Sequence, residues 1–266
     1  EGESEEEMGL RLADELETKI LELGPESVIG FVAETVVGAT AGAVPPAPGY
    51  FRRIREICDR YGVLLILDEI MCGSGRTGTY FAFEHDGIRP DIATLAKGIG
   101  GGYQPLAATV IKARVAQTLY ESGFAHGHTY IGHATACAAG LAVQQVMDDE
   151  GLLERTRQQG ERFDELLNER FGDHPRVGDI RGRGLFRALE LVSDRGSKRG
   201  FENGGALPHQ LMLAALEAGL ICYPGGIIDD GAMVPHIMLA PPMILEERHM
   251  LECMDRLAMT LESVFS

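Results

Sequence analysis

An unbroken run of five apolar residues, Val63-Leu64-Leu65-Ile66-Leu67, constrains the fold of this chain more than any other feature. A strand that is apolar on both faces is typical of a parallel sheet that helices cover on both sides. Shorter apolar strands are expected over residues 91–96 and 106–111, and helical spacing predicts helices over residues 51–61 and 134–147. This alternation predicts an α/β fold, a three-layer domain of sheet and helices.

The pattern of elements changes part-way along the chain. Residues 152–171 predict an amphipathic helix, a strand pair follows within residues 177–192, and the spacing of apolar residues over 250–261 predicts a terminal helix. We therefore expect residues 1–150 to form part of a large α/β domain and residues 151–266 to form a smaller α+β domain. The remaining expected elements are a helix over 6–23, a strand over 27–34, a helix over 208–218 and short strands near 220 and 237.

The composition is that of a folded protein with an acidic surface. Of the 266 residues, 45% are hydrophobic and 24% are charged, which excludes a disordered or collagen-like chain. The formal net charge of −16, without a Lys/Arg patch, argues against a nucleic acid or an anionic membrane as a partner. No apolar run approaches the roughly 18–20 residues that cross a bilayer. The five cysteines are odd in number and contain no C-x-x-C pair, so we expect a reducing, cytoplasmic location.

Three of the expected strands end in polar residues: Glu34, Asp68-Glu69 and Lys97. In open α/β sheets, ligands bind beyond the carboxyl ends of the strands, so these residues are the first candidates for a site. A carboxylate that follows five apolar residues is expected to be partly buried and to need a cation or several donors. The glycines after Lys97 allow the backbone to approach a bulky ligand. The alternative is an ordinary buried Asp68–Lys97 ion pair, or two solvated strand ends.

Two stretches of sequence carry a resemblance to a known family. They are LDEIMCGSGRTG over residues 67–78 and RPDIATLAKG over residues 89–98. With them the chain resembles the class-III, fold-type-I aminotransferases, and the resemblance runs from Glu34 to the Ala240-Pro241-Pro242 turn. It implies that residues 1–150 belong to the large domain that binds pyridoxal 5'-phosphate (PLP).

The resemblance implies roles for three residues. Lys97 would carry PLP as a Schiff base and, once displaced by substrate, would move the proton between the substrate carbon and the cofactor. A positioned proton shuttle of this kind contributes roughly 10²–10⁴-fold to a rate. Asp68 would hold the protonated pyridine nitrogen, which makes the ring an electron sink. Ile70, two residues further and therefore on the same side of the strand, would pack on one face of the ring, unless it is a plain core residue.

The segment GHTYIGH, residues 127–133, matches the family's loop in which a threonine hydroxyl donates to the cofactor phosphate of the neighbouring subunit. Thr129 is therefore a predicted phosphate ligand, and this role implies a homodimer with shared active sites. The alternative is that Thr129 is a turn residue or the N-cap of the helix that follows. His126, His128 and His133 lack the spacing of a zinc site, so no metal is expected.

The chain departs from the family near its C-terminus. Members that handle amino acids usually place an arginine there, because a guanidinium matches a carboxylate bidentately. Tyr223 and Met238 occupy two family locations of that arginine. Glu34 therefore lacks the arginine with which it pairs in some relatives, and Thr35 stands where a proline is common. Either another residue holds the substrate carboxylate, with Arg183 as one possibility, or the donor is an amine or an ω-amino acid.

Two glycine-rich stretches are not interpreted as nucleotide loops. A dinucleotide turn needs G-x-G-x-x-G directly after a strand, whereas a lysine precedes the glycines of residues 98–102. The stretch GRTG over residues 75–78 could be mistaken for an anion loop, and we interpret Arg76 as structural.

The leading hypothesis is a PLP-dependent transaminase. It would move an amino group from an amine, ω-amino acid or amino acid to a 2-oxo acid, such as pyruvate or 2-oxoglutarate, by a ping-pong Schiff-base mechanism. The alternatives are an aminomutase, racemase or decarboxylase on the same scaffold, or an inactive truncated dimerisation module.

The opening residues, EGESEEE, run directly into a helical pattern, so we expect this chain to be a fragment. The resemblance places upstream the Gly/Ser turn that binds the phosphate at a helix N-terminus and the aromatic residue that stacks on the ring. The fragment would therefore lack half of the cofactor site.

Overall fold

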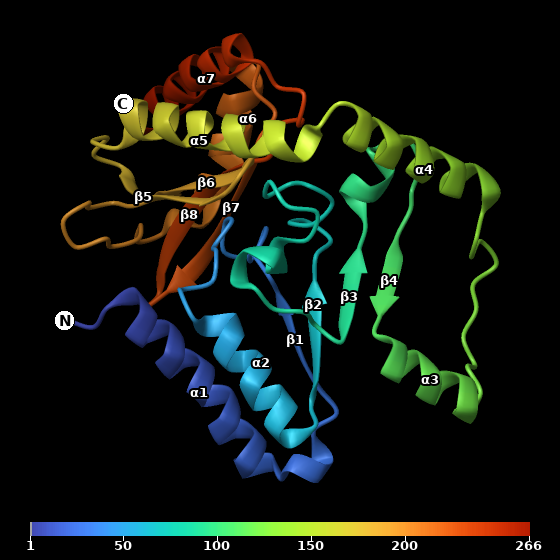
Figure 1. Cartoon of the computed structure of the whole chain (residues 1–266). Helices are drawn as coiled ribbons and strands as arrows, with labels where there is room; N and C mark the ends of the chain where they lie inside the picture. The colour runs from blue at the N-terminus through green and yellow to red at the C-terminus, as the bar shows by residue number, and fades with distance from the viewer. Residues whose placement is uncertain (1) are drawn as a thin grey trace. The chain divides into compact units, whose positions relative to one another are not determined.

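The structure is a computed structural model that describes residues 2–266, and the chain divides into two compact units (Figure 1). The N-terminal unit contains the residues up to Thr35, together with Pro46–Gly75 and Thr79–Glu150. The C-terminal unit contains Val36–Pro45, Arg76–Gly78 and Gly151–Ser266. Each unit has its own four-stranded sheet and its own core.

The sheet of the N-terminal unit is mixed. Its strands are β1 (Gly30–Glu34), β2 (Leu64–Asp68), β3 (Ile92–Leu95) and β4 (Ala108–Ile111), in that order. The first three are parallel, and β4 runs antiparallel to β3. The α/β fold class is confirmed, and the antiparallel strand has a local reason: no α-helix lies between β3 and β4, and a parallel partner needs such a crossover.

Four α-helices belong to the N-terminal unit: α1 (Glu5–Leu23), α2 (Tyr50–Tyr61), α3 (Ala113–Ser122) and α4 (Ala134–Asp149). Three of them were expected. The sequence reasoning missed α3, which buries none of its residues. The 3-10 turns of this unit are η1 (Pro25–Ser27), η2 (Ala82–Asp86) and η3 (Lys97–Gly100).

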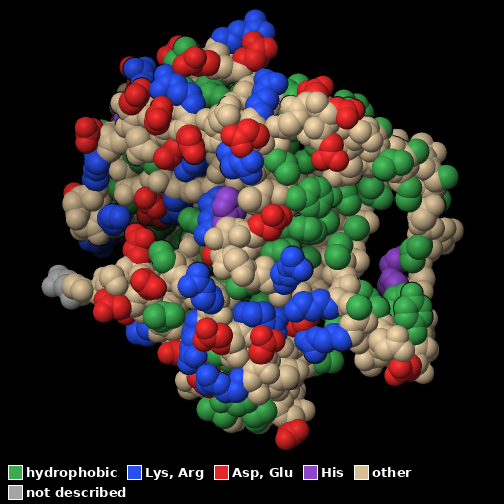
Figure 2. All heavy atoms as spheres, in the orientation of Figure 1, with side chains coloured by type: hydrophobic (Ala, Val, Ile, Leu, Met, Phe, Trp, Pro, Cys, Tyr) green, Lys and Arg blue, Asp and Glu red, His purple; other side chains and the backbone are tan. Residues whose placement is uncertain are grey.

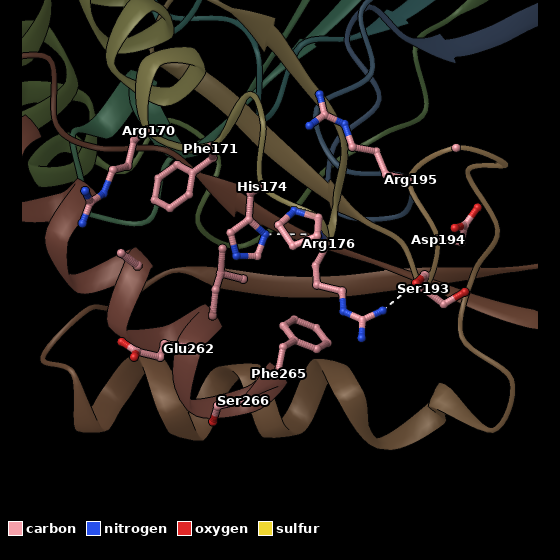
Figure 3. A pocket seen from close by; sticks show the side chains of 14 residues that line it. Arg170, Phe171, His174, Arg176, Ser193, Asp194, Arg195, Glu262, Phe265 and Ser266 are labelled. Carbon is pink, nitrogen blue, oxygen red and sulfur yellow. Dashed lines mark hydrogen bonds between the residues drawn. The ribbon is translucent and has the colours of Figure 1, made fainter.

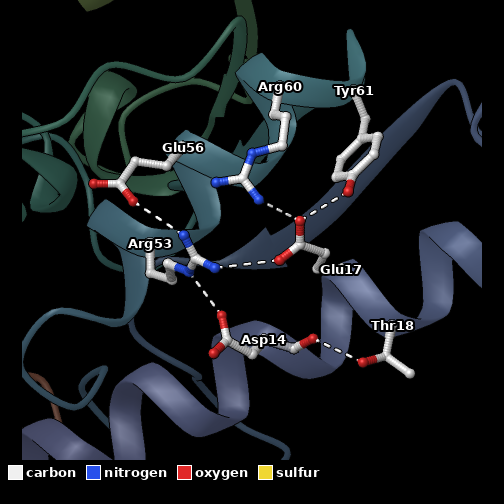
Figure 4. A network of polar contacts seen from close by, with 7 residues as sticks. All are labelled: Asp14, Glu17, Thr18, Arg53, Glu56, Arg60 and Tyr61. Atoms are coloured by element: carbon white, nitrogen blue, oxygen red, sulfur yellow. Dashed lines mark hydrogen bonds and ion pairs between the residues drawn. The ribbon is translucent and has the colours of Figure 1, made fainter.

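Helices α1 and α2 pack side by side and join through ion pairs (Figure 4). Arg53 on α2 donates to Asp14 over 2.7 Å and pairs with Glu17 over 3.2 Å, both on α1. Tyr61 and Arg60 also donate to Glu17. Beneath this polar rim lies the core of the unit, in which Phe51, Ile54 and Ile57 of α2 pack with Leu65 and Leu67 of β2, all of them fully or almost fully buried.

Helix α4 packs against the turn that follows β3. Gln144 donates to the carbonyl of Ile99, a residue of η3, over 3.2 Å. Gly140 lies against Leu106 so closely that an added Cβ would approach the leucine side chain to 2.4 Å. The carboxyl end of β3 is therefore held from outside the sheet by a long helix.

The C-terminal unit has an antiparallel sheet with three helices. The strand order is β5 (Val177–Arg183), β6 (Phe186–Leu191), β8 (Ala232–Leu239) and β7 (Tyr223–Asp229). The helices are α5 (Leu152–Phe171), α6 (Leu207–Glu217) and α7 (Glu247–Phe265), with a 3-10 turn η4 (Gly204–Ala206) before α6. The short strand expected near residue 220 begins at Tyr223 and continues for seven residues. The core gathers apolar residues from the helices α5, α6 and α7 and from the strands β5, β6 and β8.

The surface of the chain carries both signs of charge. Figure 2 shows acidic and basic side chains interspersed over the face in view. Among the described residues, no helix combines the length and the apolar character that a membrane span needs.

Candidate active site

The polar strand ends Glu34, Asp68 and Lys97 lie at one edge of the sheet. In the register of the parallel strands, Glu34 faces Asp68 and Asp68 faces Thr94. Lys97 follows Thr94 by three residues, just past the end of β3. The carboxyl ends of β1, β2 and β3 thus bring together two carboxylates and one amine from three separate parts of the sequence.

Asp68 is partly buried and has one occupied carboxylate oxygen. Its Oδ1 accepts the backbone N–H of Ile70 over 2.8 Å. No donor within the described chain reaches Oδ2. The fixed oxygen orients the carboxylate, while the other oxygen can accept a hydrogen bond from a bound ligand.

Lys97 is exposed and stands on an unusual backbone. Its φ is +47°, in the left-handed region that residues with side chains seldom adopt and that concentrates at functional sites. Its side chain makes neither an ion pair nor a hydrogen bond with any described residue. The alternative of a buried Asp68–Lys97 ion pair is therefore not found.

Ile70 lies close to Asp68, but not for the predicted reason. Strand β2 ends at Asp68, so the strand alternation that was to place the two side chains on one side does not reach Ile70. Ile70 instead lies in the following turn, where its N–H holds Asp68. The contact of Ile70 with a cofactor ring stays a prediction.

Glu69 was one of the predicted polar strand ends, but the sequence assigned it no role. Its carboxylate is fully buried and accepts from the Thr35 hydroxyl over 2.5 Å and from the backbone N–H groups of Ala82 and Phe83 over 2.7 and 3.1 Å. Burial raises the pKa of Glu69, and these hydrogen bonds act in the opposite direction. The sequence signal for a buried acid was the pair Asp68-Glu69 after an apolar strand. Successive side chains of a strand point to opposite faces, so one of the two acids points inward. The Thr35 hydroxyl thus has a structural role, because it donates a hydrogen bond to the buried Glu69.

Thr129 lies apart from the other predicted site residues. It is exposed, in the connection between α3 and α4 that Figure 1 shows running outside β4, and its hydroxyl makes no hydrogen bond within the described chain. Histidine and hydrophobic side chains are exposed on this segment at the right of Figure 2. Of the two alternatives for Thr129, the N-cap role is wrong, since His133 is the N-cap of α4 and accepts the N–H of Ala136. Thr129 does lie in a turn, which is closed by a hydrogen bond of 3.1 Å from the N–H of Ile131 to the carbonyl of His128.

The histidines of this connection stack on each other rather than converge. The rings of His126 and His128 lie 4.8 Å apart, edge to face. Among the described residues, no group of three or more His, Cys, Asp and Glu side chains is arranged to hold a metal ion.

A comparison with family models matches residues 1–261 to the class-III aminotransferases. The chain belongs to that family. Its relatives include an aminotransferase of Gibberella zeae, 45% identical over 91% of this chain and 48% of the relative. A diaminobutyrate–2-oxoglutarate transaminase of Halomonas elongata is 41% identical over 83% of this chain and 48% of the relative. A taurine–pyruvate aminotransferase of Bilophila wadsworthia is 38% identical over 81% and 48%.

Solved ω-transaminases have the same fold as this class-III chain. A thermostable (S)-enantioselective ω-transaminase from Thermomicrobium roseum superposes with a TM-score of 0.91 at 35% identity, over 100% of this chain and 58% of that one. The Pseudomonas jessenii ω-transaminase in complex with PMP gives a TM-score of 0.88 at 38% identity, over 98% and 57%. The predicted fold is thus confirmed. The chain spans about half the length of the curated relatives it matches.

The two residues that were predicted to replace an arginine of the family are cross-strand neighbours in this class-III chain. Tyr223 on β7 faces Met238 on β8. The tyrosine is exposed and the methionine is buried. Neither side chain can bind a carboxylate as a guanidinium does.

Arg76, in the GRTG stretch, links two loops of the C-terminal unit. It donates to the carbonyls of Leu185 and Pro241, and burial lowers its pKa to about 10.

A pocket of about 920 Å³ lies in the C-terminal unit and is lined by none of the four predicted site residues (Figure 3). Arg176 lies 5.9 and 5.8 Å from the ring centroids of Phe201 and Phe265 and donates to the carbonyl of Ser193. Because its guanidinium is held in this way within the unit, we place no site there.

Proposed function

We propose that the full-length protein is a PLP-dependent transaminase that transfers an amino group from an amine, ω-amino acid or amino acid to a 2-oxo acid such as pyruvate or 2-oxoglutarate. The observation that carries the proposal is the pair Asp68 and Lys97 at the carboxyl ends of adjacent parallel strands, both without an ion pair. Family membership supports it. The division into a cofactor-binding large domain, residues 1–150, and a small domain, residues 151–266, belongs to the same proposal.

The chemistry of these donors fits PLP. Asp68 offers an open carboxylate oxygen to a protonated ring nitrogen, and Lys97 offers an amine without a competing acid. Bound PLP supplies an electron-withdrawing ring that stabilises negative charge on the substrate carbon. The P. jessenii relative was solved with PMP, the amine form of this cofactor.

Each predicted residue then has one task. The Asp68 carboxylate keeps a proton on the ring nitrogen, because a buried anion favours the charged form of a cationic neighbour. The Lys97 amine accepts the proton from the substrate carbon and returns it, which requires a mobile side chain on a fixed backbone. Ile70 packs on one ring face.

A second copy of the protein contributes a residue to the site in this proposal. Thr129 donates to the cofactor phosphate of the neighbouring subunit, which makes a homodimer. The exposed apolar side chains on the α3–α4 region support this role, since contiguous apolar patches mark interaction surfaces. They are Tyr120, Phe124, Tyr130, Ile131 and Leu141, each at least 60% exposed.

The donor specificity follows from Tyr223 and Met238. Without an arginine at either position, an α-carboxylate has no bidentate partner there, which favours amines and ω-amino acids as donors. The five free cysteines support a cytoplasmic location.

The test uses the full-length protein, PLP and borohydride, followed by peptide mass spectrometry. A pyridoxyl adduct on Lys97, absent from a Lys97→Ala variant, is expected. An adduct on another lysine, or none, contradicts the proposal. Donor panels with pyruvate and 2-oxoglutarate then measure the reaction: release of a 2-oxo acid from the donor is expected, and rearranged product without such release would identify a mutase instead.

A further inference from the structure

Two residues with left-handed backbones meet at the candidate site. Lys97 has φ +47° and Ser74 has φ +53°. Such residues persist only where the surrounding structure over-determines them. A contact that holds Lys97 in this conformation is therefore to be expected.

Ser74 makes that contact through the residue after Lys97. A Cβ added to Gly98 would lie 3.0 Å from the Cβ of Ser74, closer than the roughly 3.5–4.0 Å at which carbon atoms attract. The φ of Gly98 lies outside the left-handed region, so its backbone conformation tolerates a side chain. A glycine is therefore required at this position because Ser74 lies so close, and not because of the backbone conformation.

Ser74 is itself held in place. It is 1% exposed. The preceding Gly73 donates to the carbonyl of Glu69 over 2.8 Å and packs so that an added Cβ would approach Leu95 to 2.9 Å. The following Gly75 donates to the carbonyl of Tyr80 over 3.3 Å. The turn that leaves β2 after Asp68 is therefore fixed against the end of β3.

The Ser74 hydroxyl is buried without a hydrogen-bond partner among the described residues. An unpaired buried hydroxyl destabilises the fold, so hydrogen bonding within this chain does not explain the residue. Its contact with Gly98 does.

We propose that Ser74 is a positioning residue for Lys97: its Cβ, packed on Gly98, keeps the Lys97 turn in its left-handed form. The proposal rests on the proposed function, because it concerns how the Lys97 amine is aimed. The size of two facing residues then sets the rate at which Lys97 takes up PLP.

A size-swap experiment in the full-length protein tests this contact. Gly98→Ala adds a Cβ that pushes the Lys97 turn away from Ser74. The rate of PLP attachment to Lys97 and kcat are each expected to fall by roughly 10- to 100-fold, as for a misplaced reacting group. KM is expected to change by less than about threefold. Ser74→Gly removes the opposing Cβ. The double variant Ser74→Gly/Gly98→Ala is therefore expected to recover most of the loss. Attachment is followed in cofactor-free protein by borohydride quenching and mass spectrometry, independently of turnover.

Three comparisons make the result specific. Gly205→Ala, at a glycine with nothing within 4 Å of an added Cβ, is the control and should leave the rates unchanged. Ser74→Ala keeps the Cβ and should lie closer to the wild type than Ser74→Gly. Ser74→Gly should slow attachment several-fold without lowering the thermal midpoint, since glycine suits φ +53°. If Gly98→Ala does not fold, the attachment rate of Ser74→Gly tests the role of the contact by itself.

Wild-type attachment rates in Gly98→Ala, or no recovery in the double variant, would overturn the role of the contact. A Ser74→Ala variant as slow as Ser74→Gly would also overturn it, because the hydroxyl would then be the active part. A wild-type protein without any adduct on Lys97 would overturn the proposed function itself, and this inference with it.

Discussion

Asp68 combines a fixed oxygen with an open one, and this asymmetry suits a residue that must hold a ligand proton. Asparagine has the same shape, so an Asp68→Asn variant can still accept the N–H of Ile70. It has no negative charge to keep a ring nitrogen protonated. The two properties of the side chain can thus be separated by a single substitution.

We expect Asp68→Asn to lower kcat by roughly 10²–10³-fold, the usual effect of removing one preorganised electrostatic group. The urea midpoint should change little. Asp255→Asn, at an exposed aspartate of α7, provides the control. Steady-state kinetics and urea unfolding of the three proteins give both quantities, and a variant with normal kcat would remove Asp68 from the mechanism.

At the scale of elements, Asp91 ties the opposite end of β3 to its neighbours. Its buried carboxylate accepts the N–H of Leu65 over 2.9 Å and pairs with Arg55, Arg114 and Lys112 at 2.8, 2.6 and 3.1 Å. Burial alone would raise the pKa of Asp91, but these donors outweigh it and hold the pKa well below its usual range. One side chain therefore connects β2, β3, α2 and the start of α3.

Asp91→Asn should lower the free energy of unfolding by about 3 kcal/mol at pH 7, because it removes the buried negative charge that pairs with three cationic side chains. Asp59→Asn is the matched control: Asp59 pairs with the same Arg55 over 2.8 Å but is 63% exposed, so a loss below about 1 kcal/mol is expected.

The depressed pKa of Asp91 also predicts how the stability of the protein changes with pH. The contribution is complete above about pH 4 and disappears as the pH falls through the lower folded-state pKa. Urea titrations from pH 3 to 7 measure both the stability lost in each variant and its dependence on pH. Equal losses in Asp91→Asn and Asp59→Asn would contradict the structural role of Asp91.

His236 on β8 holds a loop of the C-terminal unit. Its ring is 1% exposed and hydrogen-bonds the backbone of Ala39, while Nε2 has no partner among the described residues. Gly42 and Gly225 leave room for the ring, since a Cβ on either would approach it within 2.6 Å. Burial, and then the nearby Arg181 guanidinium, lowers the pKa of His236 below its usual value.

This depressed pKa predicts a loss of stability in mild acid. Below about pH 6.5 the unfolded chain binds a proton that native His236 does not, so stability falls by at most about 1.4 kcal/mol per pH unit until the folded-state pKa is reached. Urea unfolding at pH 7.5, 6.5 and 5.5 measures the slope. His236→Gln should have a shallower slope than the wild type, and an unchanged slope would exclude His236 as its source.

At the scale of the whole molecule, the proposed dimer predicts complementation between two inactive subunits. A Lys97→Ala subunit keeps Thr129, and a Thr129→Ala subunit keeps Lys97. If Thr129 serves the neighbouring site, one of the two sites in a mixed dimer has both native residues. Mixing and refolding the two full-length variants should therefore restore up to about a quarter of the wild-type activity, since half of random dimers are mixed and each has one native site.

Activity no higher than the sum of the separate variants would show that Thr129 serves its own subunit or none. Light scattering on the wild type gives the oligomeric state independently.

The sequence by itself determined the α/β class, the strand ends Asp68 and Lys97 and the family, because apolar runs and turn residues act over a few neighbouring positions. It did not determine how these ends are held. The donors to Glu69 come from 34, 13 and 14 residues away, and the contact between Ser74 and Gly98 joins two turns that the chain visits separately. Only the tertiary structure decided these contacts, because hydrogen bonding and close packing depend on which distant segments meet.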